Sequence, residues 1–211
     1  MQETPEKTIL ETFEKQRSFF ASHATKSISF RITQLKKLKR VIRENQTKIE
    51  EALWKDLHKS PEEAFLTEIS LVLGEIDNHI LNLKQWAKPK RTSTPIHLRP
   101  SSSKVIYEPL GVALIIAPWN YPFQLLMNSL IGAISGGCCS VLKPSPDAEV
   151  IAKLMEKMIA ETFDEQYIRI LQGGKETNTL LLRQKFDVIF FTGSSRVGKI
   201  VICLLYTSPS P

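Results

Sequence analysis

The longest apolar stretch of the chain runs from Leu110 to Leu142 and contains no Asp, Glu, Lys, Arg or His, although 24% of all residues are charged. A stretch of this kind is expected to be buried. A single membrane-spanning helix would need ~20 consecutive apolar residues, and Pro118, Asn120 and Pro122 interrupt this one. The pattern instead predicts a strand, a turn, a helix and a second strand.

The first strand is expected over residues 111–117, an aliphatic run bounded by glycine and proline that is typical of a parallel strand buried on both faces. From Phe123 onward apolar residues recur at helical spacing until a pair of glycines ends the helix, and residues 139–142 form the second strand. Such a unit is a right-handed crossover, and ligands bind beyond the carboxyl ends of its strands. Asn120 and Lys143 each lie just past such an end.

The same alternation of strands and helices continues downstream. Helical spacing predicts a helix over residues 147–163, and further strands are expected over residues 167–171 and 187–191, with a short helix over 176–183 between them. Four strands joined by crossover helices predict an α/β fold with an incomplete doubly wound, Rossmann-like parallel sheet. This partial domain is expected to span residues 108–202.

The N-terminal part of the chain is expected to be helical. Apolar spacing predicts one helix within residues 33–57. Residues 60–63 form a capping box with proline at the first helical position, so a second helix should begin there and end near Trp86. Residues 1–87 are therefore expected to pack on the sheet domain as a helical segment. Residues 88–107, rich in Pro, Ser, Thr and basic side chains, are expected to be a linker or hairpin.

Three short motifs follow one another along the chain. Residues 109–112 and 118–122 read Pro-Leu-Gly-Val and Pro-Trp-Asn-Tyr-Pro, residues 143–145 read Lys-Pro-Ser, and residues 190–198 read Phe-Phe-Thr-Gly-Ser-Ser-Arg-Val-Gly. In this order they resemble the aldehyde dehydrogenase superfamily, most of all its class-3-like branch with a short N-terminus. The resemblance extends to about residue 202. It implies the N-terminal part of an enzyme that oxidises aldehydes to carboxylic acids with NAD or NADP through a cysteine thioester.

The resemblance gives the turn at residues 118–122 a catalytic role. It implies that Asn120 donates its side-chain amide to the oxyanion of the reaction intermediates and that Trp119 contributes to the cofactor site. An uncharged amide fixed at a strand end can stabilise developing negative charge without changing its own protonation state. The alternative is that Asn120 only closes its own turn.

Lys143 resembles the lysine of this family that binds the adenine ribose of the cofactor. An ammonium group offers three donors and a positive charge. The alternative is a lysine that ends a strand in order to reach solvent. NAD-preferring members usually carry glutamate three positions later, where this chain has Pro146 followed by Asp147. Because that carboxylate would repel a 2′-phosphate, its absence leaves both NAD and NADP open.

The third motif places a strand before a helix, whose unpaired N–H groups and positive dipole end would meet the cofactor phosphates. The same residues nearly match the phosphate loop G-x-x-x-x-G-K-[ST]. That alternative fails because Ile200 stands where magnesium coordination requires Ser or Thr. The resemblance implies cofactor contacts from Thr192, Gly193, Ser194 and Gly198.

The three cysteines, Cys138, Cys139 and Cys203, show neither the spacing of metal ligands nor a disulfide framework, so no metal site is expected. The first two lie at a buried strand entry, where packing explains them better than reactivity. In the family, the nucleophilic cysteine and a glutamate base occur further along than this chain extends. We therefore predict that the chain alone has no dehydrogenase activity. Residues 203–211 match nothing in the family and are interpreted as a non-native tail; the alternative is a natural short isoform.

The net charge of +6 includes a basic cluster between Lys26 and Arg43. A polyanion or an anionic membrane is one interpretation of such a cluster. Without interleaved aromatic residues a solvated helix face is favoured, so no nucleic-acid partner is expected and membrane association stays open. The charged first 20 residues do not resemble a signal peptide, which favours a cytoplasmic location.

Partners follow from the resemblance, which implies an aldehyde substrate and a homodimer for the full-length enzyme. The alternative function is a noncatalytic truncated module that binds a nucleotide, or binds a partner through the exposed edge of an unfinished sheet.

Overall fold

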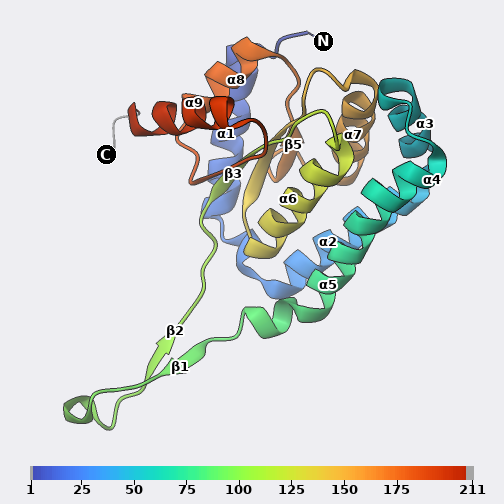
Figure 1. Ribbon diagram of the computed structural model, residues 1–211. Helices are drawn as coiled ribbons and strands as arrows, with labels where there is room; N and C mark the ends of the chain where they lie inside the picture. Colours follow the sequence, from blue (N-terminus) through green and yellow to red (C-terminus); the bar gives the residue numbers. More distant parts are fainter. Residues whose placement is uncertain (1, 208–211) are drawn as a thin grey trace.

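The centre of the computed structural model, which describes residues 2–207, is a four-stranded sheet in the order β5-β4-β3-β6 (Figure 1). All neighbouring strands in it are parallel. This arrangement confirms the predicted α/β fold and the predicted positions of its strands. The strands are β3 (Val112–Ile116), β4 (Cys139–Lys143), β5 (Ile168–Ile170) and β6 (Val188–Phe191).

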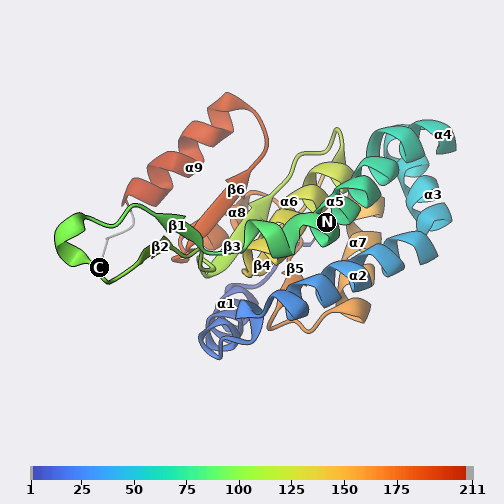
Figure 2. The same ribbon diagram turned by 90° about the horizontal axis from the view of Figure 1, so that it is seen from below.

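Helices cover both faces of the sheet, as a doubly wound fold requires. On one face lie α6 (Pro122–Gly136) and α7 (Glu149–Thr162). The other face is covered by α1 (Glu6–Ala21), α8 (Lys175–Leu182) and α9 (Ser195–Thr207). Figure 2 shows α1 and α6 on opposite sides of β3 and β4.

The strand residues alternate between the two layers. Leu114 and Val141 pack in one buried cluster with Ile9 of α1, whereas Ile115 and Leu142 belong to the larger cluster on the α6 side. Successive side chains of a strand point to opposite faces. Because both faces are covered, every residue of β3 and β4 is buried, which accounts for the uncharged run in the sequence.

The prediction of a single helix within residues 33–57 is wrong, because the structure has two helices there. They are α2 (Ile28–Glu44) and α3 (Gln46–Leu57). Between them Asn45 leaves the helical conformation, with φ −112° and ψ 13°, and its side-chain Nδ2 donates to the carbonyl of Val41 (2.9 Å). The apolar spacing continues across this break, so the sequence pattern did not reveal it. A short 3-10 turn, Ala24–Lys26, precedes α2.

The second N-terminal helix begins and ends where it was predicted. Its first turn is α4 (Pro61–Ala64), followed by a π-helical turn (Phe65–Ile69) and by α5 (Ser70–Trp86). The side chain of Ser60 accepts a hydrogen bond from the amide of Glu63 (3.2 Å), which confirms the predicted N-cap. π-helical turns are rare and often occur at functional sites.

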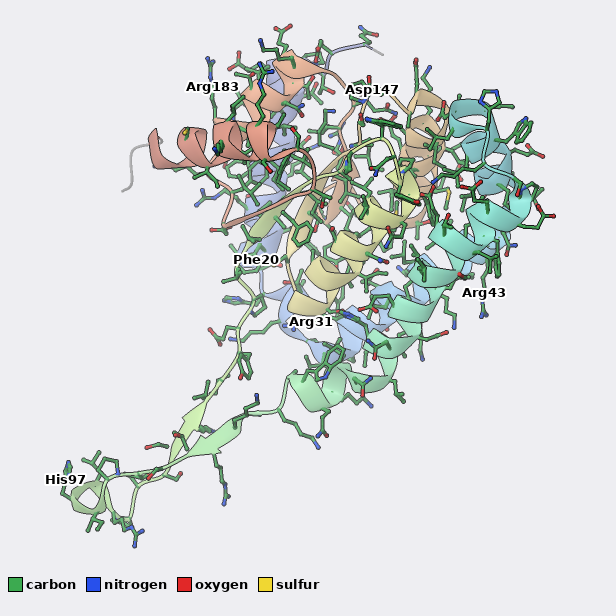
Figure 3. The ribbon with its side chains drawn as sticks, viewed as in Figure 1. Phe20, Arg31, Arg43, His97, Asp147 and Arg183 are labelled. Carbon is green, nitrogen blue, oxygen red and sulfur yellow. The ribbon has the colours of Figure 1, made fainter. Side chains whose placement is uncertain are left out.

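Between α5 and β3 the chain forms a narrow arm. Its strands, β1 (Lys90–Thr92) and β2 (Ser103–Val105), pair antiparallel, and a 3-10 turn (Ile96–Leu98) lies between them. The arm projects away from the rest of the molecule (Figures 1 and 2), with His97 at its tip (Figure 3). Ile96 is 82% exposed there, an apolar side chain that the described residues leave uncovered.

The structure bears on the expected C-terminal tail and on membrane-spanning helices. Helix α9 continues to Thr207, so residues 203–207 of the expected non-native tail are helical, and residues 208–211 lie outside the described part. Within residues 2–207 no helix combines the length and the apolar composition needed to cross a bilayer.

Candidate functional site

The carboxyl ends of three neighbouring strands meet at one edge of the sheet. Ile116, the last residue of β3, pairs with Lys143 of β4 on one side and with Phe191 of β6 on the other. The amide of Thr192 donates to the Ile116 carbonyl (3.0 Å), which keeps the two chains together just past the strands. The segments that follow the three strands therefore start side by side. They contain Trp119, Asn120, Thr192, Gly193, Ser194 and Gly198, and Lys143 is the last residue of β4 at the same edge.

The gap between β3 and β6 is the point at which the sheet changes its winding direction. Helix α6 leaves β3 toward one face, and α9, which contributes Val201 to the other buried cluster, leaves β6 toward the opposite face. In open α/β sheets ligands bind at such a switch point, outside the carboxyl ends of the strands. Residues 118–122 and 193–198 border it.

Asn120 lies in the exposed turn that leads into α6. Its backbone carbonyl accepts a hydrogen bond from Lys59 Nζ (3.0 Å). Its side-chain amide has no hydrogen-bond partner within residues 2–207, so it does not close its own turn there. The amide is exposed at the strand edge and can donate to an incoming group.

Sequence reasoning missed the two side chains that support this turn. Glu68 is fully buried, and its Oε1 lies 2.6 Å from Lys59 Nζ. Its Oε2 accepts from the amides of Phe123 (2.9 Å) and Gln124 (3.1 Å), at the start of α6. Lys59 Nζ also lies 3.9 Å from the ring centroid of Tyr121. The N-terminal segment thus contacts the chain at Asn120 and directly after it, where the turn leads into α6.

A sequence signal for Glu68 did exist. It lies midway between Ala64 and Val72 at a spacing of four, and all three side chains are fully buried. A carboxylate in the middle of a buried helical stripe is uncommon unless it is paired. Lys59 had no comparable signal, because it precedes the helix in a short polar segment.

Lys143 is only 1% exposed, which excludes the interpretation of a lysine that ends its strand in solvent. Its Nζ donates to the carbonyl of Pro144 (2.7 Å). Burial lowers the pKa of this ammonium group to about 8, while the nearby carboxylates of Glu3 and Asp147 oppose that shift. Figure 3 places Asp147 at the end of the molecule where α6 begins. Near neutral pH Lys143 is a buried cation with few partners.

The loop after β6 has the features expected of a helix start that binds an anion. Ser194 caps α9, because its Oγ accepts from the amide of Val197 (3.4 Å) and its carbonyl accepts from that of Gly198 (2.9 Å). The amides of residues 193–196 have no partner in the part of the chain that the structure describes. A Cβ on Gly193 would meet the Phe191 ring at 2.6 Å, so glycine allows the loop to pass over that ring.

A cavity of about 570 Å³ lies between α6 and the strands β3 and β6, and it extends from Thr192 at this edge to Cys138 near the opposite end of the strands. Its lining is mainly apolar and includes Gln124 and Asn128 of α6 and Phe190, which is 52% exposed. Of the site residues predicted from the sequence, Thr192 lines this cavity, whereas Asn120 and Lys143 do not.

The remaining sequence candidates behave as structural residues. Cys138 and Cys139 are buried, and burial raises the pKa of the Cys139 thiol to about 12, which agrees with a packing role. Within the basic cluster Arg31 is buried and donates to the carbonyl of Ser135 (3.0 Å), while Lys39 pairs with Asp77. Among the described residues no group of three or more His, Cys, Asp and Glu side chains is arranged to hold a metal ion.

Comparison with known proteins gives a consistent result. The family model described as "Aldehyde dehydrogenase family" matches residues 1–206, slightly further than the expected boundary near residue 202. The 4,4'-diaponeurosporen-aldehyde dehydrogenase of Staphylococcus aureus is 45% identical over 193 residues, which are 92% of this chain and 42% of that protein. Aldehyde dehydrogenase family 3 member B1 of Bos taurus is 40% identical over 192 residues, 91% of this chain and 41% of that protein.

Solved structures agree with these relatives. The substrate-bound state of Staphylococcus aureus AldH superposes with a TM-score of 0.93 at 44% identity, and the match covers 95% of this chain and 44% of that one. Glyceraldehyde-3-phosphate dehydrogenase GapN from Methanocaldococcus jannaschii, complexed with NADP, gives a TM-score of 0.81 at 20% identity over 97% of this chain and 45% of its own, which shows a shared fold. The chain spans about two-fifths of the length of the curated relatives it matches.

Proposed function

This chain belongs to the aldehyde dehydrogenase family, in its class 3 branch, and from that premise we propose that it is the N-terminal, cofactor-binding part of an NAD(P)-dependent enzyme that oxidises aldehydes to carboxylic acids. The nucleophilic cysteine and the glutamate base of the thioester route would come from the part of the relatives' length that this chain does not span. The observation that carries the proposal is the exposed amide of Asn120, without a partner in residues 2–207, at the edge where three strand ends meet.

The residues at this edge fit a dinucleotide. The unpartnered amides at the positive end of α9 and the missing side chain at Gly193 suit phosphate groups. We propose that Thr192, Gly193, Ser194 and Gly198 hold the phosphates, that Lys143 binds a ribose and that Trp119 contacts the cofactor. When bound, NAD or NADP supplies the oxidising power by accepting a hydride. Pro146 leaves the choice between the two open.

The role of Asn120 follows from its position. When a thiolate attacks an aldehyde, negative charge develops on the carbonyl oxygen, and a donor already in place stabilises that charge without reorganising. The amide of Asn120 is such a donor. Removing one donor of this kind typically lowers kcat by about 10²–10³-fold.

The test joins residues 1–206 of this chain to the remaining part of the Staphylococcus aureus relative, in place of that relative's matching segment. We expect this chimera to oxidise aldehydes, and Asn120→Ala to lower its kcat about 10²–10³-fold with little change in cofactor affinity. Asn78→Ala, at an exposed asparagine on α5, is the matched control and should leave kcat unchanged. Full activity of the Asn120→Ala chimera would show that the proposed catalytic role is wrong.

The 211-residue chain by itself is predicted to bind a dinucleotide weakly and to oxidise no aldehyde. Aldehyde-dependent NADH or NADPH formation by the purified chain would contradict this prediction.

We extend the proposal to a cytoplasmic enzyme that forms a homodimer, with the β1–β2 arm as part of the contact between subunits.

A noncatalytic binding module is the second candidate function. It is favoured by β6, the last strand of the sheet in the described chain, on which Phe190 is 52% exposed. An edge strand with exposed apolar residues can pair with another chain. Mass spectrometry of the native protein separates the candidates: a natural product of 211 residues supports the module, and a product of the relatives' length supports the enzyme.

A further inference from the structure

Lys59 and Glu68 form an ion pair unlike the others in the described chain. Their side chains are 9% and 0% exposed, whereas each of the other ion pairs within residues 2–207 has at least one partner that is 41% exposed or more. Both residues come from the N-terminal helical segment. Lys59 contacts the turn that follows β3, and Glu68 contacts the first amides of α6. Their carboxylate and ammonium groups meet at the start of α6.

The two side chains distribute their hydrogen bonds in a definite way. One carboxylate oxygen of Glu68 faces Lys59, and the other accepts from the amides of Phe123 and Gln124. A negative charge on the first amides of a helix is favourable because these groups lack partners within the helix and carry the positive end of the dipole. Glu68 therefore caps α6 from 55 residues away in the chain.

Lys59 contacts the turn just before α6, at Asn120 and Tyr121. Its ammonium group donates to the carbonyl of Asn120 (3.0 Å) as well as to Glu68 (2.6 Å). It also lies over the ring of Tyr121, where a cation is attracted to the face of the aromatic ring. The peptide of Asn120 and the two amides of α6 that follow are thus fixed by a single buried pair.

A buried ion pair is not an efficient way to stabilise a fold. Removing two charges from water costs about as much as their attraction returns, and apolar residues of similar volume often stabilise a protein equally well or better. What apolar side chains cannot do is bind the Asn120 carbonyl and the α6 amides. The cost of this pair therefore makes sense if the geometry of the turn matters more than stability.

We propose that Lys59 and Glu68 are positioning residues for Asn120, which hold its turn rigid so that the side-chain amide is aligned before a substrate arrives. This inference rests on the proposed function, in which that amide donates to a developing oxyanion. Preorganised donors are effective because they do not reorganise during the reaction, and a misplacement of about 1 Å can lower a rate about 10²-fold.

A double variant separates positioning from simple stabilisation. In Lys59→Met/Glu68→Leu both charges are replaced by apolar groups of similar size, so no uncompensated charge is buried and the unfolding midpoint should stay close to that of the wild type. The turn, however, loses its contacts. In the 211-residue chain we expect the amides of Phe123 and Gln124 to exchange with solvent about tenfold faster, and the side-chain NMR signals of Asn120 to broaden.

The matched control is Lys39→Met/Asp77→Leu, which removes the more exposed pair between α2 and α5. It should leave the exchange of Phe123 and Gln124 and the Asn120 signals unchanged. Wild-type exchange and wild-type Asn120 signals in the Lys59→Met/Glu68→Leu variant would overturn the inference. If that variant does not fold, Glu68→Gln decides the question, because it keeps the volume and one acceptor and should loosen the turn to a smaller extent.

The chimera described above connects the turn to catalysis. There the Lys59→Met/Glu68→Leu variant should lower kcat per folded molecule about 10²-fold with unchanged KM for the cofactor. Because a loss of folded enzyme also lowers the apparent kcat without changing KM, the folded fraction is measured separately from the stoichiometry of cofactor binding. If Asn120→Ala lowers kcat and the double variant does not, the positioning inference is wrong. If Asn120→Ala has no effect, the proposed function fails, while exchange and NMR on the 211-residue chain still decide whether the pair orders the turn.

Discussion

Two helices start at the same edge of the sheet, and they are held in different ways. The start of α6 is fixed by Lys59 and Glu68, a buried ion pair from a separate segment of the chain. The start of α9 is held by its own residues: Ser194 caps it, and Gly193 passes over the ring of Phe191. Both follow neighbouring strands, β3 and β6, yet within residues 2–207 only the start of α6 is hydrogen-bonded to a side chain distant in the sequence.

This difference shows what the N-terminal helices contribute. They cover the sheet, and they also complete one half of the candidate site, the half that contains the proposed catalytic amide. The half at α9, where we propose that the cofactor phosphates bind, is more exposed, with Phe190, Val197 and Ile200 each at least 44% exposed. We infer that the donor for the reaction is preorganised in this chain, whereas the phosphate loop is only partly supported by it.

The strongest test of the comparison is to break the anchor of α6 on one side. Lys59→Met leaves the carboxylate of Glu68 buried without its cation, and such a change typically costs about 3–5 kcal/mol of unfolding free energy. We expect a loss of that size in urea unfolding. Asp77→Ala, which breaks a half-exposed pair, should cost less than about 1 kcal/mol. Equal losses of unfolding free energy for the two variants would mean that the buried Lys59–Glu68 pair contributes no more to stability than the half-exposed Lys39–Asp77 pair.

The second test compares the packing beneath the two helices. Leu126 of α6 is fully buried in the larger cluster, and Val201 of α9 is 5% exposed in the smaller one. Leu126→Ala should cost about 2–5 kcal/mol through lost burial and a residual cavity. Val201→Ala removes two methyl groups and should cost about 1.5 kcal/mol. Urea unfolding of both variants measures the loss of unfolding free energy. A larger loss for Val201→Ala would mean that α9 is packed more firmly on the sheet than α6.

Lys143 provides a test at a third strand end. Because burial disfavours its charge, its pKa in the folded chain is about 8 instead of the ordinary 10.5. Between these two pH values the unfolded state binds more protons than the folded state, so the folded state should gain stability as pH rises from about 8 to 10.5. Lys143→Met should remove this gain.

An NMR titration of the Lys143 side chain measures its pKa directly. A midpoint near 8 is expected, and NAD or NADP should shift it upward, because cofactor phosphates favour the charged form of a neighbouring lysine. The positive charge should also make cofactor affinity fall above that midpoint, by about tenfold per pH unit when binding requires one proton. A midpoint near 10.5 would show that Lys143 is solvated and that the buried arrangement is wrong.

Local patterns predicted β3 and β4 well because these two strands are buried on both faces. Residues 111–117 and 139–142 needed no information from elsewhere in the chain to be recognised, and the cap at Ser60 is equally local. The alignment of Asn120, Lys143 and Thr192 at one edge followed from the rule that parallel strands share their carboxyl ends. The functional roles of these residues stay predictions.

The missed features are polar residues whose partners lie far away in the sequence. Gln16 of α1 is fully buried and donates to the carbonyl of Ser140 (3.0 Å), 124 residues later, although a glutamine on a charged helix looks like a surface residue. Glu68 and Lys59 are similar, with partners 55 and 61 residues away. Periodicity describes which face of a helix is apolar, but a polar residue in that face becomes intelligible only when the fold supplies its partner.

The smallest predicted effect comes from removing the serine caps of α9 and α4. It tests whether each helix start unfolds locally or only together with the whole chain. Ser194→Ala removes the cap of α9 and should cost that helix about 1 kcal/mol. Since α9 is the less firmly held helix, hydrogen exchange at Val197 and Gly198 should accelerate while the global unfolding midpoint stays nearly constant. Ser60→Ala removes a cap with the same chemistry at the start of α4, in the segment that anchors α6. There the loss should appear in the global midpoint, because that segment unfolds only with the core; a global loss from Ser194→Ala as well would mean that both starts belong to one cooperative unit.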